Sequence, residues 1–267
     1  MGNNVLTNIG EAAERSLEDI LAKREVHRRP EADVRRYTYA EPKRLEKEEV
    51  AENWRDLFER RYDSLRKALR FIEQPTGKTF ENYEVTCPEQ KRAVAICRRF
   101  ADRLLERVVT AQNSAAGILL VGVCGTGKTH MAYAILDELR KRKMPGFAIS
   151  ATDFFDCMQP SFASTIDTPA SKLRELLAGV SCLVIDEVGM QSWTEAERKR
   201  LIQIINLRTA NALPTVITTN CTEDEITKSG GERLASRFAE TMYPIVCVWE
   251  DHRKKNALAK RNPEEIF

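Results

Sequence analysis

The chain has 267 residues, of which 42% are apolar and 31% are charged. These values fit a globular protein with one sizeable core and a smaller appended region. The 42 basic residues nearly cancel the 40 acidic ones, so any binding of nucleic acid must come from a local patch rather than from the overall charge.

Features of membrane or secreted proteins are missing from the sequence. No stretch approaches the ~20 consecutive apolar residues that cross a bilayer, and the N-terminus lacks the basic and apolar regions of a secretory leader. Seven cysteines are dispersed without a C-x-x-C pair, which argues against a disulfide framework and a zinc site. We therefore expect a cytoplasmic protein with no membrane partner.

The N-terminal part, residues 1–76, combines helical patterns with charge-rich spacers. Residues 9–26 predict a short helix, and residues 27–44, with two prolines, predict a linker. Apolar residues recur at helical spacing over 45–71, which predicts a longer helix with an apolar stripe. This stripe either closes a small helical domain on itself or binds a partner, and the pattern alone leaves both interpretations open.

From residue 77 to 267, apolar strand patterns alternate with helical ones, which indicates a parallel sheet wrapped by helices. The expected strands are 117–121, 146–150, 182–185, 215–219 and 245–249. The expected helices are 88–109, 128–143, one from 152, 170–177 and 194–212. We therefore predict an α/β domain with a five-stranded parallel sheet over 77–267, preceded by the helical region 1–76.

A phosphate-binding motif follows the strand at 117–121. Residues 122–129, Gly-Val-Cys-Gly-Thr-Gly-Lys-Thr, match the pattern G-x-x-x-x-G-K-[ST]. Glycines let such a loop curl so that backbone N–H groups and a helix N-terminus face phosphate oxygens. Lys128 would reach the β- and γ-phosphates, and the Thr129 hydroxyl would ligate Mg²⁺. The expected nucleotide-binding residues here are Gly122, Gly125, Thr126, Gly127, Lys128 and Thr129, with ATP and Mg²⁺ as cofactors.

Polar residues end the next strands of the predicted sheet. Asp186, at the end of an apolar strand, would hold Mg²⁺ through water, and Glu187 would act as the general base on the attacking water. Asn220, at the tip of strand 215–219, would lie between the γ-phosphate and that water. Taken alone, these side chains would be solvated loop acids and a turn asparagine, and it is the phosphate-binding motif in the same sheet that favours catalysis.

Two arginines lie four residues apart in Gly231-Glu-Arg-Leu-Ala-Ser-Arg237. This spacing puts Arg233 and Arg237 on one face of a helix. Arginine suits the phosphate charge of a transition state because it stays protonated and presents a planar fork. Without the other motifs, the pair would be an ordinary solvated basic face.

These motifs, in this order, resemble an AAA+ ATPase, and within that superfamily the DnaC-type replicative helicase loaders, which are related to IstB-like ATPases. Residues 79–83, Thr-Phe-Glu-Asn-Tyr, resemble the segment that leads into that family's ATPase core. Residues 185–189 resemble its Asp-Glu motif, residues 231–237 its arginine-finger motif and residues 249–253 its closing segment. The resemblance spans about residues 78–255 and is thin over 1–76.

The resemblance implies an ATP-dependent loader that binds the hexameric replicative DNA helicase and helps to deposit it on single-stranded DNA during replication initiation. It implies a self-oligomer with ATP at the subunit interfaces, where Arg237 acts on a neighbour's ATP with support from Arg233. Arg253 would be a second phosphate sensor, although about 14 residues after it are too few for a substantial C-terminal lid. ATP hydrolysis is expected to be weak and stimulated by DNA or the partner.

The resemblance also suggests where DNA and the helicase bind. The residues expected at single-stranded DNA are Phe162, Lys172, Arg174, Trp193 and Thr194. The aromatic rings would stack on bases or line a channel, and the basic residues would contact phosphates. In the N-terminal region, Trp54 is the expected anchor for the helicase, because buried aromatics carry much of the energy of an interface. Each of these aromatic side chains would otherwise be part of the core.

Two other functions stay open at this point. An adaptor would use ATP mainly to set its conformation, with little turnover, while the N-terminal region binds the partner. An IstB-like transposition ATPase would have a similar ATPase core but a transposase as its partner. The segment at 79–83 and the helical N-terminus favour the loader over the transposition ATPase.

Overall fold

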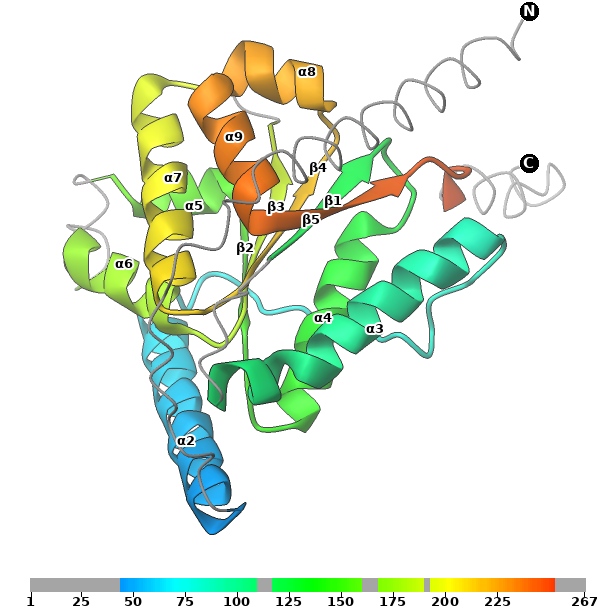
Figure 1. Cartoon of the computed structure of the whole chain (residues 1–267). Helices are drawn as coiled ribbons and strands as arrows, with labels where there is room; N and C mark the ends of the chain where they lie inside the picture. The colour runs from blue at the N-terminus through cyan, green and yellow to red at the C-terminus, as the bar shows by residue number, and fades with distance from the viewer. Residues whose placement is uncertain (1–43, 110–116, 160–167, 190–192, 253–267) are drawn as a thin grey trace, which may run out of the picture.

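The computed structural model describes residues 44–109, 117–159, 168–189 and 193–252, which form a parallel sheet covered by helices on both faces (Figure 1). The strands are β1 (Gly117–Gly122), β2 (Phe147–Ser150), β3 (Leu183–Val188), β4 (Thr215–Thr219) and β5 (Met242–Cys247). They are all parallel and lie in the order β2-β3-β4-β1-β5. The predicted five-stranded parallel sheet is therefore confirmed.

Most of the described helices begin and end close to where the sequence patterns place them, although no helix was predicted at residues 223–225. They are α2 (Arg44–Ala68), α3 (Pro88–Val109), α4 (Lys128–Lys141), α5 (Ala151–Cys157), α6 (Ala170–Gly179), α7 (Glu195–Ala210), the short α8 (Glu223–Glu225) and α9 (Glu232–Thr241). A single π-helical turn, η2 (Ile226–Gly230), joins α8 to α9. The helix expected over 9–26 lies outside the described residues. Among the helices described here, none is both long and apolar enough to span a bilayer.

The core has two apolar layers, one on each face of the sheet, because successive strand residues point to opposite faces. Along β1, Ile118 and Leu120 pack with α3 and α4, whereas Leu119 packs in the layer beneath α5, α6, α7 and α9. Residues of β3 alternate in the same way, with Val184 on the first face and Ile185 on the second. The sheet is therefore buried on both sides, as expected for a parallel sheet.

Helix α2 packs onto the sheet and contributes to both layers. Phe58 belongs to the layer with α3 and α4, while Leu65 belongs to the other layer. The Arg61 guanidinium donates a 2.9 Å hydrogen bond to the carbonyl of Gly179 at the end of α6. Among the described residues, α2 therefore shares its buried side chains with the core layers on both faces of the sheet.

After α2, the chain runs along the edge of the sheet. The Gln74 side-chain amide donates to the Ala148 carbonyl at 3.0 Å and accepts from the Ala148 N–H at 2.9 Å. Ala148 lies in β2, the edge strand at this side of the sheet. Gln74 thus satisfies backbone groups that an exposed edge would leave open to another strand.

The fifth strand is the clearest departure from the expected boundaries. We expected it at 245–249, but β5 starts at Met242, paired with Gly117, and ends at Cys247. Its last expected residue, Trp249, instead leaves the sheet, and its indole N–H donates a 2.7 Å hydrogen bond to the carbonyl of Thr126. Contact with the phosphate-binding loop therefore ends the strand earlier than its apolar pattern suggests.

Candidate nucleotide-binding site

The loop at 122–129 connects β1 to α4 and wraps around a lysine. Lys128 is the first residue of α4 and is only 6% exposed. Its ammonium group donates 2.7 Å hydrogen bonds to the carbonyls of Gly122 and Val123. The positive charge is therefore held inside the curl of the loop, where a phosphate would be bound.

Two glycines allow this curl. Gly125 and Gly127 have φ angles of +80° and +83°, a left-handed conformation that residues with a Cβ adopt with strain. A Cβ on Gly127 would lie 2.7 Å from the Tyr83 ring, and one on Gly125 would overlap the Asp251 carboxylate. The cradle therefore fits a phosphate group through bare backbone, as the motif predicts.

Two segments far apart in the sequence hold the loop from outside. The carbonyl of Thr126 accepts a 3.0 Å hydrogen bond from the Tyr83 hydroxyl, in addition to the bond from the Trp249 indole. The backbone N–H of His252 donates to the Gly125 carbonyl at 3.0 Å. Burial raises the pKa of Tyr83, so this hydroxyl remains a donor. The resemblance had singled out both segments, but not this bracing role.

Asp186 lies in β3 directly before the exposed Glu187 and is itself only 7% exposed. The Thr129 hydroxyl donates a 3.1 Å hydrogen bond to Oδ1 of Asp186, and the Thr218 hydroxyl donates to the same oxygen. The Tyr133 hydroxyl donates to Oδ2 at 3.1 Å. The structure thus brings together the two expected Mg²⁺ ligands, a hydroxyl and a carboxylate, which are the hard oxygen donors that Mg²⁺ prefers.

Glu187 sits at a local break in the sheet. The register of β3 against β4 shifts between Ile185 and Val188, and Glu187 has φ +61°, a value that is uncommon for residues other than glycine and is concentrated at functional sites. Its backbone N–H donates a 2.9 Å hydrogen bond to the Thr218 hydroxyl. The break places the Glu187 side chain in solvent while Asp186 stays buried.

Asn220 and the paired arginines come from separate elements of the fold. Asn220 follows β4, the strand next to β3, and is half-buried. Arg233 and Arg237 lie on α9, where Arg233 is exposed and Arg237 forms a 2.7 Å ion pair with Glu240. In the part of the chain that is described, neither arginine is hydrogen-bonded to its own phosphate-binding loop. Arg253 lies outside the described residues.

The structure contradicts one expected DNA contact and leaves others open. Trp193 is 5% exposed and packs in the core, so its indole is not available to stack on a base. The position of an aromatic residue after a strand does not indicate whether its side chain is buried. Here the Trp193 ring fills part of the core layer. The Thr194 hydroxyl is the N-cap of α7 and exchanges hydrogen bonds with Glu197. Lys172 pairs with Glu175 at 3.0 Å on the surface, and Phe162 lies outside the described residues.

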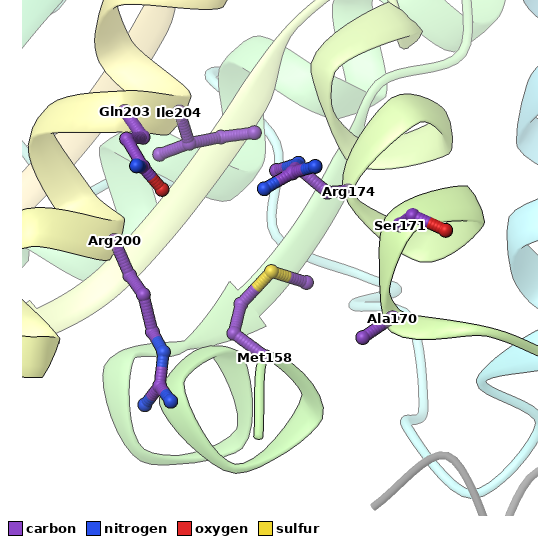
Figure 2. A pocket seen from close by; sticks show the side chains of 7 residues that line it. All are labelled: Met158, Ala170, Ser171, Arg174, Arg200, Gln203 and Ile204. Carbon is purple, nitrogen blue, oxygen red and sulfur yellow. The ribbon is translucent and has the colours of Figure 1, made fainter. Parts of the chain in front are cut away.

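Arg174 lines a pocket of about 160 Å³ between the end of α5, α6 and α7 (Figure 2). Arg200, from α7, lines the same pocket, and Met158 and Ile204 contribute its apolar part. Neither arginine forms an ion pair or a hydrogen bond with another described residue. No sequence pattern singles out Arg200, because only the fold brings α7 beside α6.

Trp54 is half-buried on α2 and stacks on Phe58, with 5.3 Å between the ring centroids. It also lines a groove of about 660 Å³ between α2, α6 and α7, together with Arg61 and the exposed Leu207. The indole is therefore partly core and partly surface, and its role as a helicase anchor stays a prediction.

Comparison with known proteins supports the interpretation of the motifs. A family model described as IstB-like ATP binding protein matches residues 34–237. The chain is 30% identical over 179 residues to the replicative helicase loader DnaC of Escherichia coli (strain K12), a match that covers 66% of this chain and 69% of that protein. DnaC of Buchnera aphidicola subsp. Schizaphis graminum is 27% identical over 178 residues, with the same coverage.

Solved structures show a similar fold. A crystal structure of the DnaC helicase loader superposes with a TM-score of 0.55 at 22% identity. The matched region covers 64% of this chain and 96% of the chain in that structure. The replication initiator DnaA bound to AMPPCP and single-stranded DNA gives a TM-score of 0.57 at 21% identity, covering 73% of this chain and 58% of DnaA. The AAA+ fold and the resemblance to DnaC-type loaders and IstB-like ATPases, both predicted from the motifs, are confirmed.

Proposed function

Because this chain belongs to the family of IstB-like ATP-binding proteins, we propose that it is an ATP-dependent loader that binds a replicative DNA helicase and helps to deposit it on single-stranded DNA. The observation that carries this proposal is the 30% identity to a DnaC helicase loader over 179 residues, covering 69% of that protein. That stretch of similarity is much longer than the phosphate-binding motif, which many ATP-binding proteins share.

ATP hydrolysis in this proposal follows from the residues around Thr129 and Asp186. Lys128 binds the β- and γ-phosphates, and Thr129 with Asp186 holds the metal, Asp186 through water. When bound, Mg²⁺ offsets the negative charge that builds up on the phosphate oxygens. Glu187 polarises the attacking water from its exposed position after the strand, and Asn220 orients it. Turnover is slow until DNA or the partner is bound.

The active unit of this proposal is an oligomer with ATP between subunits. Arg237 reaches the ATP of the neighbouring subunit and Arg233 supports it. The support for this comes from the two sides of α9. Leu234 and Phe238 pack in the core, whereas Arg233 and Arg237 do not belong to it. An ion pair as exposed as Arg237–Glu240 contributes little to stability, so the arginine can exchange its carboxylate for a phosphate.

Binding of DNA and of the helicase is assigned to different surfaces. Arg174 and Arg200 offer two guanidinium groups without a carboxylate partner among the described residues, and we assign them, with Lys172, to backbone phosphates of single-stranded DNA. Residues 1–76 hold the helicase, with Trp54 as anchor. Its half-exposed position at the groove between α2, α6 and α7 supports this assignment.

One observation favours a second function. The family model that matches residues 34–237 is that of IstB-like proteins, so a transposition ATPase with a transposase as partner is the alternative. An ATP-switched adaptor with little turnover is a variant of either function. The loader is preferred because curated DnaC loaders match over two-thirds of this chain.

The test is a loading assay with the purified full chain. We expect it to form a complex with the hexameric helicase of its host and to increase, in the presence of ATP, the amount of helicase retained on circular single-stranded DNA, which has no end to thread. The Lys128→Ala variant should fail. Binding to a transposase and not to the helicase would refute the loader. If Glu187→Gln loads helicase without turnover, the adaptor is correct.

A further inference from the structure

Tyr133 touches the proposed metal site although no part of the phosphate-binding motif includes it. It lies four residues after Thr129 on α4, so the two side chains share one face of the helix. Both hydroxyls donate to the same carboxylate, Thr129 to Oδ1 and Tyr133 to Oδ2 of Asp186, each at 3.1 Å. One helix therefore holds both oxygens of this side chain.

A third hydroxyl reaches the carboxylate from the sheet. Thr218 lies in β4, the strand beside β3, and donates to Oδ1 of Asp186. Its oxygen also accepts the backbone N–H of Glu187 at 2.9 Å. Thr218 thus connects the proposed metal ligand with the proposed general base, and its side chain is 1% exposed.

We propose that Tyr133 is a positioning residue that, together with Thr218, fixes the Asp186 carboxylate in the orientation needed for Mg²⁺. This inference rests on the proposed ATP-dependent function. The last torsion of an aspartate is broad, so a carboxylate with a single donor can rotate. A donor on each oxygen keeps Oδ1 turned toward Thr129, and outer partners of this kind commonly set the affinity of a metal site.

Tyr133→Phe tests the proposal because it removes only the hydroxyl. In the full chain with a non-hydrolysable ATP analogue, binding of Mn²⁺ as a spin probe for Mg²⁺ is measured by electron paramagnetic resonance. We expect Mn²⁺ to bind about tenfold more weakly, while the affinity for the nucleotide without metal stays that of the wild type. The control is Tyr243→Phe, on the exposed face of β5, which should leave both affinities unchanged. Equal Mn²⁺ affinity in Tyr133→Phe and wild type would overturn the proposal.

Thr218 gives an independent pair of variants. Thr218→Val loses the hydroxyl with little change in shape and should weaken Mn²⁺ binding, whereas Thr218→Ser keeps the hydroxyl and should restore it. Equal Mn²⁺ affinity in these two variants would contradict the role of Thr218. A wild-type chain that binds neither nucleotide nor Mn²⁺ would refute the ATP-dependent function itself, and the inference with it. A wild type that binds both, with variants that bind equally well, refutes the positioning role alone.

Discussion

The hydroxyl of Thr129 donates a 3.1 Å hydrogen bond to Oδ1 of Asp186, although 57 positions separate the two residues in the sequence. Thr129 lies in the first turn of α4, after the loop that follows β1, and Asp186 lies near the end of β3. Because parallel strands end at the same edge of a sheet, the contact joins the two halves of the proposed magnesium site. The proposed hydrolysis of ATP depends on the residues at this edge of the sheet.

Loss of the buried ammonium should abolish tight nucleotide binding. Lys128→Ala removes the cation that now donates to two loop carbonyls and that would bind the phosphates of ATP. We expect the affinity for ATP to fall by roughly 100-fold, or about 3 kcal/mol, the upper range for hydrogen bonds to charged groups. Isothermal titration calorimetry measures it. Lys141→Ala, at the exposed end of the same helix, is the matched control and should bind like the wild type.

Glu187→Gln should separate binding from hydrolysis. The amide keeps the size of the side chain but cannot accept a proton, and general bases typically contribute about 10²- to 10⁴-fold. We expect single-turnover ATP hydrolysis to slow by a factor in that range while the affinity for ATP is unchanged. Glu195→Gln, an exposed acid of α7, should hydrolyse ATP normally. Full hydrolysis by Glu187→Gln would assign the base to another residue.

Arg174 and Arg200 should share the binding of DNA phosphates. Replacing either by alanine should weaken binding of single-stranded DNA irrespective of its sequence. It should also reduce the slope of log affinity against log salt concentration by about 0.7 for each phosphate that the variant no longer neutralises. Fluorescence anisotropy with a labelled oligonucleotide at several salt concentrations gives the slope. Arg60→Ala, on the exposed face of α2, should leave it unchanged. A wild-type slope in both pocket variants would remove this pocket from the DNA-binding surface.

His130 should make the protein less stable in mild acid. Its Nε2 lies 2.9 Å from the Thr79 carbonyl oxygen and 3.0 Å from Oδ1 of Asn82, and burial lowers the pKa of this histidine. The folded state therefore binds the proton more weakly than the unfolded state, whose histidine pKa is about 6.5, and stability falls as the pH drops below that value.

The variant His130→Gln isolates this contribution. Between pH 7 and pH 5, its free energy of unfolding, measured with urea, should fall less than that of the wild type. Between pH 8 and pH 7 the two proteins should differ much less, because the histidine is mostly neutral in both states. An equal fall between pH 7 and pH 5 would show that carboxylates alone cause the acid sensitivity.

Local patterns predicted the sheet and the loop well because their physics is local. An apolar strand followed by glycines, lysine and threonine predicts a phosphate-binding loop, and because parallel strands end at the same edge, Asp186 comes close to Thr129. Burial of a side chain depends on the tertiary fold, so the sequence around Trp193 did not indicate that its indole packs in the core. In the same way, the apolar stripe of α2 did not reveal that it packs on the ATPase core.

Residues that act across the fold were also missed. Tyr133 reaches Asp186 from a helix face that no motif covers, although its spacing of four from Thr129 was a usable signal. Trp249 lies outside β5 and donates its indole N–H to the Thr126 carbonyl. Thr126 lies more than a hundred positions earlier in the sequence, so no pattern near Trp249 could predict this contact. Contacts of this kind depend on the tertiary arrangement and not on any pattern within one segment.

Arg208 is the most deeply buried charge in the described part of the chain, with 0% exposure at the end of α7. Its guanidinium donates to the carbonyls of Leu177 and Val180 at 3.0 and 2.9 Å and to the Thr215 hydroxyl at 3.1 Å. Burial lowers the pKa of Arg208 to about 10, so the group is still charged at neutral pH. It thereby ties α7 to the end of α6 and to the start of β4.

Arg208→Met should therefore destabilise the protein strongly. The methionine replaces the apolar stem but leaves several buried carbonyls without donors, each costing about 1–3 kcal/mol. We expect the free energy of unfolding in urea to fall by more than about 3 kcal/mol. Arg200→Met, on the same helix but without a partner among the described residues, should change it by less than about 0.5 kcal/mol. If Arg208→Met also lowers the free energy of unfolding by less than about 0.5 kcal/mol, water must satisfy these carbonyls in the variant. The Arg208 guanidinium would then not be what joins α7 to the sheet.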